Sequence, residues 1–456
     1  MAGDGRRGDA ENAPPLPPYP STVGHPLTHS FRTMRDVFGF RDRALANHDV
    51  VRVRLFGPGD VYHFAHPDHF DRVLVSDREQ FRKSEDFRIA FGRGLVAAEG
   101  GEWRRQREVL QPLFRRERLR SHADTIVEQV RRRRRRWDDG ERIDLPAETS
   151  QLSLDVLFAT LFGRELALDG DEDVREAAGR LSDWFTPTSY PLPNWVPTPA
   201  RRRFEAGRRR LRAVADRLLA EKAANPPSTP ADADDLLSLL VALRESGAGE
   251  RDALGDDRLR DQVVTMIFAG HDTTATAIAF AFYALATNSD VRRRFHAEVD
   301  RLDGPPTVED LDSLDVTDRI VTETLRLYPP VYTIPREAAA DVTVGGYRVP
   351  AGSRIFLAVE QVQRDPRFFD DPETFRPGRW TDGLRRDLPD FAYAPFGGGP
   401  RRCIGRELAR IEAKLALATV GREYELRRES TDADPPLAPE MTLGMESGTT
   451  FRVVER

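Results

Sequence analysis

The chain has 456 residues, of which 39% are hydrophobic and 33 are glycine, the usual composition of a protein that buries a core. Its 69 basic and 75 acidic residues give a net charge of -6, so bulk charge indicates no nucleic-acid partner. The only cysteine, Cys403, excludes an intrachain disulfide and a zinc site built from several thiolates, and it favours a reducing compartment. We therefore expect a folded, cytoplasmic protein.

Residues 1–24 form a proline-rich leader, which we expect to be flexible. The leader lacks the run of about seven or more apolar residues that a signal peptide or membrane span requires, which predicts a soluble protein without a membrane anchor. Apolar residues at helical spacing then predict a helix over 27–47. Two β-branched runs, 50–56 and 61–64, flank a Gly-Pro-Gly turn and predict a hairpin.

From about residue 102 to 286 the hydrophobic pattern is helical almost throughout, and we predict no strand there. A proline-rich loop at 187–199 and a polar segment at 225–235 interrupt it. The run Arg131–Arg136 points all round a helix axis, so it cannot form one nucleic-acid face. Acidic neighbours favour a solvated, ion-paired helix end, and the alternative is a docking surface for an acidic protein.

Two motifs of this helical stretch bear on chemistry. Trp103 and Arg107 lie one turn apart near a helix start, and alone they indicate a packing tryptophan and a surface arginine. The apolar stretch 258–288 contains the sequence Ala-Gly-His-Asp-Thr-Thr at 269–274. Because a carboxylate inside a buried helix is costly to desolvate, this motif indicates either a functional site or a polar kink in which Thr273 bonds the preceding turn.

The last third of the chain returns to strands. Glu323 and Arg326 place opposite charges on one helical face, a pair that is weak evidence by itself. Beyond Pro329 the predicted strands are 342–344, 347–349, 354–357 and 442–454. No repeat or phosphate loop is found. The sequence therefore predicts one domain, 25–456, that is mainly α with a minor β region formed from both ends of the chain.

Cys403 follows a glycine-rich turn and precedes an amphipathic segment that runs to about Val420. At a helix N-terminus, backbone N–H groups and the helix dipole lower the pKa of a thiol, which favours metal ligation. The glycines let the backbone pass close to a flat group, and Gly405 keeps the space beside the sulfur free. Without this setting, a lone cysteine is more often an inert small hydrophobe.

The turn matches the pattern Phe-x-x-Gly-x-Arg-x-Cys-x-Gly in full, at Phe396, Gly399, Arg401, Cys403 and Gly405. With it the chain resembles the cytochrome P450 family of haem-thiolate monooxygenases, in its soluble microbial type without a fused reductase. Four further motifs appear in the family's order, and together the motifs cover the chain from about Trp103 to Ala409. The resemblance implies the cytochrome P450 fold, a triangular helical prism with haem b between the long distal helix and the cysteine-loop helix.

The resemblance also implies roles for single residues. Cys403 would be the ligand of the haem iron, where a thiolate favours O–O cleavage. Phe396 would pack beside its sulfur and Gly405 would leave that side open. The haem propionates would be held by Trp103, Arg107, Arg336 and Arg401.

On the distal side, Ala269 and Gly270 would leave room for dioxygen, and Asp272 with Thr273 would relay protons to it. His271 is expected to be structural. A buried ion triad would consist of Glu323, Arg326 and Arg379. One departure from the family pattern is Gln363, which stands where histidine is usual.

The implied reaction is dioxygen activation with two electrons and insertion of one oxygen atom by hydroxylation or epoxidation. No flavin or dinucleotide motif is present, so we expect a ferredoxin or flavodoxin with its NAD(P)H-dependent reductase to supply the electrons. A basic patch that could steer this partner consists of Arg104, Arg105, Arg402 and Arg406. We expect the enzyme to be a monomer.

The substrate walls expected from position, 87–91, 184–190, 266–269 and 331–334, are apolar and aromatic. They favour a lipophilic substrate such as a fatty acid, terpenoid or carotenoid. The loop 184–195 either gates entry or packs at the domain edge. Alternatives are a haem-thiolate peroxygenase or isomerase that uses Cys403 without a redox partner, and a nucleic-acid-binding protein built on the arginine run.

Overall fold

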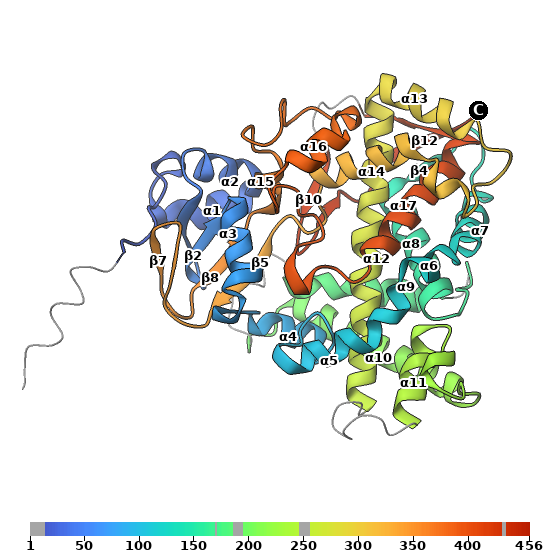
Figure 1. The fold of residues 1–456 in the computed structure, drawn as a ribbon, viewed down its shortest axis with the longest axis horizontal. Coiled ribbons are helices and arrows are strands. Elements are labelled where there is room, and N and C mark those ends of the chain that lie inside the picture. Colours follow the sequence, from blue (N-terminus) through green and yellow to red (C-terminus); the bar gives the residue numbers. More distant parts are fainter. Residues whose placement is uncertain (1–13, 169–170, 186–194, 246–255, 431–434) are drawn as a thin grey trace, which may run out of the picture.

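The computed structural model describes residues 14–168, 171–185, 195–245, 256–430 and 435–456. A large helical part lies beside a smaller part built on a sheet (Figure 1). The helices are α1 (His29–Arg35), α2 (Val37–Leu45), α3 (Pro67–Asp71), α4 (Glu85–Phe91), α5 (Gly100–Leu110), α6 (Arg116–Arg120), α7 (Ala123–Arg134), α8 (Leu145–Leu161), α9 (Glu172–Gly179), α10 (Pro199–Ala223), α11 (Leu236–Glu245), α12 (Asp256–Thr287), α13 (Ser289–Val299), α14 (Asp315–Leu327), α15 (Val359–Gln363), α16 (Asp382–Asp387) and α17 (Arg406–Gly421).

The strands are short by comparison, and they are β1 (Val50–Leu55), β2 (Gly59–Phe64), β3 (Phe81–Arg82), β4 (Arg142–Asp144), β5 (Ile334–Ala338), β6 (Val342–Val344), β7 (Tyr347–Val349), β8 (Arg354–Leu357), β9 (Tyr424–Arg428), β10 (Leu437–Pro439), β11 (Leu443–Met445) and β12 (Thr450–Glu455). The predicted fold class, mainly α with a minor β region, is confirmed.

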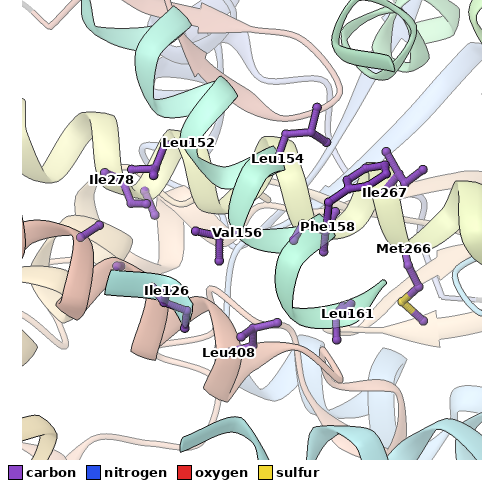
Figure 2. Packing of buried hydrophobic residues seen from close by; sticks show 14 of the residues in the cluster. Ile126, Leu152, Leu154, Val156, Phe158, Leu161, Met266, Ile267, Ile278 and Leu408 are labelled. Atoms are coloured by element: carbon purple, nitrogen blue, oxygen red, sulfur yellow. The ribbon is translucent and has the colours of Figure 1, made fainter. Parts of the chain in front are cut away.

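The 32-residue helix α12 runs through the middle of the helical part (Figure 1). Helices α8, α10, α14 and α17 pack against it. Figure 2 shows Phe158 of α8 beside Ile267 of α12, and both side chains are fully buried. A Cβ atom on Gly270 would lie 2.7 Å from Leu157 Cδ1, so α8 approaches α12 closely because this residue has no side chain.

Helix α12 is also long and apolar enough, over Asp257–Thr287, to cross a membrane. However, 78% of its most apolar window is buried inside the protein. Its apolar surface is therefore covered by neighbouring helices, as expected of the central helix of a core.

A second hydrophobic core lies under the five-stranded sheet, whose strand order is β1-β2-β8-β5-β3. Strands β2 and β8 are parallel and the other neighbours are antiparallel. Separate small sheets are formed by β4-β12-β9, by β6-β7 and by β10-β11. The sheet region thus combines segments from both ends of the chain, as the sequence predicted.

Two expectations about single elements were wrong. Strand β4 interrupts the stretch predicted to be helical, because Ile143 pairs with Phe451 of β12 in a contact that no local pattern reveals. The helix predicted over 27–47 is divided at Asp36, whose side chain accepts a hydrogen bond from Gly39 N (2.8 Å) and caps α2.

The described part of the proline-rich leader, residues 14–24, lies against the sheet. Arg348 N donates to Pro15 O (2.9 Å) and Arg52 N donates to Pro18 O (3.0 Å), while Val23 is fully buried. These contacts hold residues 14–24 in place, so the boundary predicted after residue 24 falls within packed structure. The rest of the predicted leader, residues 1–13, lies outside the described residues.

The arginine run ends α7 and is ion-paired, but it is not solvated throughout. Arg131 and Arg135 both reach Glu128, at 3.6 and 3.5 Å. Arg133 instead is buried and pairs with Asp155 of α8 at 2.8 Å. The expectation of a solvated helix end is therefore wrong for Arg133, because Asp155 compensates its charge inside the core.

Candidate functional site

A cavity of about 1200 Å³ lies between α12, the cysteine loop and the five-stranded sheet. Its lining includes Cys403 and Phe396 from the loop and Ala269 and Thr273 from α12. Within the described residues, no three His, Cys, Asp or Glu side chains lie close enough together to hold a metal ion. Cys403 is therefore the candidate metal ligand, and the sequence motifs at either side of the cavity are brought together by the fold.

The cysteine loop is closed by a hydrogen bond from Cys403 N to Phe396 O (3.0 Å). Gly399 has a φ of 63°, and a Cβ atom there would lie 2.6 Å from Leu74 O. A Cβ atom on Gly398 would meet the ring of Phe391. These two glycines therefore allow close packing against the protein itself, whereas the sequence predicted that they serve the approach to a flat group.

The Cys403 side chain is exposed to the cavity. Burial within the protein raises the pKa of its thiol, and this effect outweighs the opposing ones from the N–H of Gly405, the charges of Arg107 and Arg406 and the N–H of Arg406. Backbone N–H groups at the helix N-terminus thus act on the pKa of the thiol in the predicted direction, but burial outweighs them. Bonding to a metal ion would itself displace the proton.

Three of the cations that line the cavity, Lys83, Arg336 and Arg401, affect one another's pKa and are here called its cationic cluster. Within the described residues, none of them has a carboxylate at ion-pair distance. Lys83 Nζ donates to Val96 O, and Arg336 Nη1 donates to Pro335 O (2.8 Å). Burial, together with the charge of Arg401, lowers the pKa of Lys83, and the same two causes lower that of Arg336 to about 10. The cluster is thus a site for an anionic group.

Two of the residues predicted to contact propionates, Trp103 and Arg107, do not line the cavity. Arg107 Nη1 donates to Arg402 O (2.8 Å) and its Nε donates to Gln111 Oε1 (2.9 Å). The ring of Trp103 lies beneath the guanidinium of Arg401, 5.1 Å from its Cζ. Arg107 therefore supports the cysteine loop and Trp103 supports the guanidinium of Arg401, and neither side chain is part of the cavity lining. The third member of the cationic cluster is Lys83, which the sequence motifs did not identify.

The α12 motif faces the cavity through Ala269, Gly270 and Thr273. Thr273 Oγ1 donates to Ala269 O (2.9 Å), the bond to the preceding turn that the sequence left open as an alternative. The missing Cβ of Gly270 points towards Leu157 of α8, so helix packing explains this glycine better than room for dioxygen does.

Asp272 is turned away from the cavity lining. Its Oδ2 accepts a hydrogen bond from Thr442 Oγ1, and Thr442 itself lines the cavity. His271 Nε2 lies 2.8 Å from Ser150 Oγ on α8, and burial lowers its pKa. The structure therefore separates Asp272 from Thr273 and makes Thr442 the link between the carboxylate and the cavity, while His271 is packed between helices as expected.

A buried carboxylate that sequence reasoning missed is Glu412 on α17, which lines the cavity. Burial raises its pKa to about 8, and its Oε1 has no hydrogen-bond partner within the described residues. A signal was present, because Leu408 and Leu415 place Glu412 on the apolar face of the amphipathic segment.

The residues predicted to form an ion triad meet outside the cavity lining. Glu323 Oε1 accepts from Arg326 Nη2 (2.8 Å) and from Arg379 Nε (3.0 Å). Its Oε2 accepts from Trp380 Nε1 (2.8 Å). Nearby, Gln363 Nε2 donates to the carbonyl of Arg326 (3.0 Å) and its Oε1 accepts from Ala394 N (2.9 Å). Glutamine thus links α14 to the segment before the cysteine loop.

Of the predicted substrate walls, the described residues that line the cavity are Phe87, Phe185, Met266, Phe268, Ala269 and residues 331–334. The rest of the predicted gate, residues 186–194, lies outside the described residues. The walls are mainly apolar and aromatic, as expected for a lipophilic substrate.

The chemistry of the cavity fits haem. A sulfur ligand projects from one side, small α12 residues line another, and the cationic cluster offers charge for two propionates. The residues that would hold the group are Cys403 at the iron and Lys83, Arg336 and Arg401 at the propionates.

Comparisons with known proteins show which family shares this architecture. The cytochrome P450 family model matches residues 25–451. Cyclooctat-9-en-7-ol 5-monooxygenase of Streptomyces melanosporofaciens is 34% identical over 88% of this chain and 87% of its own length. Pentalenene oxygenase of Streptomyces avermitilis is 34% identical over 89% and 90%.

Among solved structures, the cytochrome P450DA heme domain superposes with a TM-score of 0.80 at 25% identity, covering 97% of this chain and 98% of that one. The expected prism of helices around a haem site is thereby confirmed. The family's members are haem b enzymes that need a redox partner and a lipophilic substrate. The fold, the cysteine loop and relatives aligned over nearly the whole chain all agree. This protein therefore belongs to the cytochrome P450 family and is an oxidoreductase that incorporates oxygen.

Proposed function

We propose that this enzyme inserts one oxygen atom from dioxygen into a terpenoid, using electrons from a separate ferredoxin or flavodoxin system. The observation that carries the proposal is a cavity whose lining includes Cys403, the α12 residues Ala269 and Thr273, and apolar side chains. The names of two relatives support the substrate class, since one describes monooxygenation of cyclooctat-9-en-7-ol and the other oxygenation of pentalenene.

Bound haem would supply the iron chemistry that activates dioxygen. Cys403 would provide its thiolate ligand, and the cationic cluster of Lys83, Arg336 and Arg401 would fix its orientation. Thr273 would present its hydroxyl to the cavity by releasing the carbonyl of Ala269. Asp272 Oδ2, which accepts a hydrogen bond from Thr442 Oγ1, would exchange a proton with that hydroxyl, and Thr442 would pass a proton on to the cavity.

The test is turnover by the haem-loaded protein with pentalenene, geranylgeraniol, lauric acid and β-carotene, supplied with NADPH, a ferredoxin and its reductase. We expect a hydroxylated or epoxidised terpenoid that contains one atom of labelled dioxygen. Oxygenation of lauric acid or β-carotene alone would overturn the terpenoid assignment. Efficient turnover with hydrogen peroxide and no reductase would instead favour the peroxygenase alternative.

Proton delivery is tested with Thr273→Ala, which should consume NADPH with little product because dioxygen is reduced without a positioned hydroxyl. Thr273→Ser should restore coupling. Thr276→Ala is the matched control, since Thr276 is buried on α12 but does not line the cavity. Unchanged coupling in Thr273→Ala would contradict the role given to this hydroxyl.

The electron donor would bind on the side of Cys403 that faces away from the cavity. Arg104, Arg105 and Arg402 are exposed, whereas Arg406 pairs with Glu407 at 2.8 Å. We propose that the three exposed arginines attract an acidic ferredoxin.

Combining Arg104→Glu with Arg105→Glu should slow ferredoxin-supported reduction at least tenfold at low salt and flatten its salt dependence. The matched control combines Arg202→Glu with Arg209→Glu on the exposed face of α10. Equal reduction rates in the two double variants would contradict the docking proposal. Sedimentation of the haem-loaded protein tests the expected monomer.

A further inference from the structure

Large apolar side chains are exposed in one region of the surface, beside the cavity. Among the described residues five such side chains are mostly exposed, and four of them are Leu27, Phe31, Met34 and Phe56. Leu27 lies just before α1, Phe31 and Met34 lie on it, and Phe56 lies between β1 and β2. Phe56 N donates to Ser30 Oγ (2.7 Å), which holds this turn against α1. We call these four side chains the apolar patch.

The side chains of α1 are arranged in the reverse of the usual order. His29 is fully buried, with its Nε2 3.2 Å from Gly24 O and its ring centroid 5.5 Å from that of Phe40. Phe31 and Met34, three residues apart, instead lie on the exposed face. A surface helix normally buries its apolar side chains and exposes its polar ones. Exposed apolar side chains that gather in one place indicate an interaction surface.

The apolar patch is continuous with the cavity. Met34 and Phe56 line the cavity that contains Cys403, and they are also 61% and 75% exposed. The cavity lining therefore continues to the surface at these two residues. A lipophilic molecule that leaves an apolar phase at the patch would enter the cavity without crossing water, which is the unfavourable medium for it.

Two cations of α1, Arg32 and Arg35, flank the apolar patch. Both are exposed, and neither has a carboxylate at ion-pair distance within the described residues. Asp36, the next residue in the chain, is paired with Arg43 at 3.5 Å. The patch thus carries uncompensated positive charge beside its apolar side chains. This combination is typical of helices that lie in the interface of an anionic membrane.

A second copy of the chain fits the apolar patch less well. Its four side chains offer roughly 500 Å² of exposed surface, whereas a stable interface buries roughly 800 Å² on each partner. Two-fold symmetry would also bring Arg32 and Arg35 of one copy towards the same arginines of the other. A lipid bilayer requires no matching surface, because its interface accepts single apolar side chains and its anionic headgroups attract arginine.

We propose that the apolar patch, with Arg32 and Arg35, binds the surface of an anionic lipid bilayer, and that a lipophilic substrate passes from the lipid into the cavity beside it. The binding is peripheral and reversible, because it depends on a few apolar side chains and two charges. Docking does not depend on the skeleton of the substrate, whereas the transfer step rests on the proposed function.

The first test is sedimentation of the haem-loaded protein with vesicles of phosphatidylcholine, with and without an equal amount of phosphatidylglycerol. We expect binding to the mixed vesicles that weakens at high salt. Combining Leu27→Ser with Phe31→Ser should weaken it about tenfold, because two apolar side chains no longer enter the lipid. Leu27→Met with Phe31→Leu keeps the patch apolar and should bind as the parent does.

The charge of the patch is tested separately. Combining Arg32→Gln with Arg35→Gln should weaken binding to the mixed vesicles about fivefold for each arginine. The matched control combines Arg293→Gln with Arg294→Gln, which are exposed on α13, far from α1 (Figure 1). Since both double variants change the net charge equally, an equal loss of binding in the two would overturn the role given to the arginines of the patch.

The second test follows transfer of a ligand by the rate at which the Soret spectrum changes. Geranylgeraniol and lauric acid are each supplied in mixed vesicles or in cyclodextrin. In the variant with Leu27→Ser and Phe31→Ser, transfer from vesicles should slow about tenfold and transfer from cyclodextrin should be unchanged, since neither residue lines the cavity. Equal rates in parent and variant from vesicles, or equal slowing from both carriers, would overturn the transfer step.

The outcomes separate the inference from the proposed function. Vesicle-dependent transfer of lauric acid, with no spectral response to geranylgeraniol, would support docking and contradict the terpenoid skeleton. Absence of binding to both kinds of vesicle, or binding that Leu27→Ser with Phe31→Ser leaves intact, would overturn the docking site whatever the substrate. Self-association that these substitutions abolish, without vesicle binding, would assign the patch to a contact between copies and overturn it as well.

Discussion

At the scale of single residues, the charge of the cavity is the informative feature. Lys83, Arg336 and Arg401 line one cavity, and burial and mutual repulsion lower the pKa of Lys83 and Arg336. Like charges crowded in this way are unfavourable until an anion joins them. The cationic cluster is therefore expected to favour the haem-bound protein over the haem-free one.

Lys83→Met should accordingly have opposite effects on the two states. The haem-free protein should become more stable by about 1 kcal/mol, because a buried charge is removed. Haem loss to an excess of a scavenger protein should accelerate about tenfold, because one charged contact is lost. Lys222→Met, which removes an ion pair with Asp235 outside the cavity lining, should leave haem loss unchanged. Unaltered haem loss in Lys83→Met would contradict the assignment.

Glu412 predicts a pH dependence of stability. Burial raises its pKa to about 8, above the ordinary value of 4.5, so the folded state binds the proton more tightly than the unfolded state. The contribution to stability is then complete below pH 4.5 and is lost as the pH rises to about 8. Glu412→Gln lacks this loss, so its stability relative to the parent should rise by about 1.4 kcal/mol per pH unit in that window. Urea-denaturation midpoints at pH 5, 6.5 and 8 measure it, and parallel profiles would contradict it.

At the scale of elements, the packing of α8 against α12 determines the position of one wall of the cavity. A Cβ atom on Gly270 would meet Leu157, and Figure 2 shows larger side chains of the same two helices, among them Phe158 and Ile267. Because α12 also carries Ala269 and Thr273, a shift of α12 away from α8 would change the cavity directly. The packing of two helices therefore determines where the distal residues stand.

Gly270→Ala should destabilise the protein by about 1–3 kcal/mol, because the new Cβ atom overlaps Leu157. Combining it with Leu157→Ala should recover part of that loss in a double-mutant cycle. Gly101→Ala is the control, since an added Cβ on this exposed α5 residue meets only Arg105 Nη1 at 3.5 Å. A Gly270→Ala variant as stable as the Gly101→Ala variant would exclude the proposed contact.

At the scale of the whole molecule, Glu323 joins segments that are distant in the chain. Its carboxylate binds Arg326 on the same helix and Arg379 and Trp380 before the cysteine loop, and all four side chains are buried. A buried network of this kind fixes one arrangement of its elements because each alternative leaves a charge unpaired. It thereby holds the segment that leads to Cys403.

Glu323→Gln leaves Arg326 and Arg379 buried without a carboxylate, so it should cost about 3–5 kcal/mol and reduce haem incorporation. Glu373→Gln removes the exposed pair with Arg364 (2.8 Å) and should cost at most about 1 kcal/mol. Denaturation of both purified variants provides the comparison. Similar small losses would show that the triad is not the constraint described above.

The sequence by itself determined the features that depend on spacing along the chain. The cysteine loop around Cys403, the α12 motif and the pair Glu323 and Arg326 each lie within one short segment, so residue type and interval suffice to recognise them. The mainly α class and most strands followed from periodicity for the same reason.

Only the tertiary structure decided which side chains share a space. Lys83, which no motif included, lines the cavity, whereas Arg107, which was expected at a propionate, donates to the carbonyl of Arg402 in the cysteine loop. Strand β4 exists because the end of the chain pairs with it. Arg41 pairs with Glu360, which lies 319 residues away in the chain. Such contacts depend on side-chain direction and on burial by distant segments, which no local pattern contains.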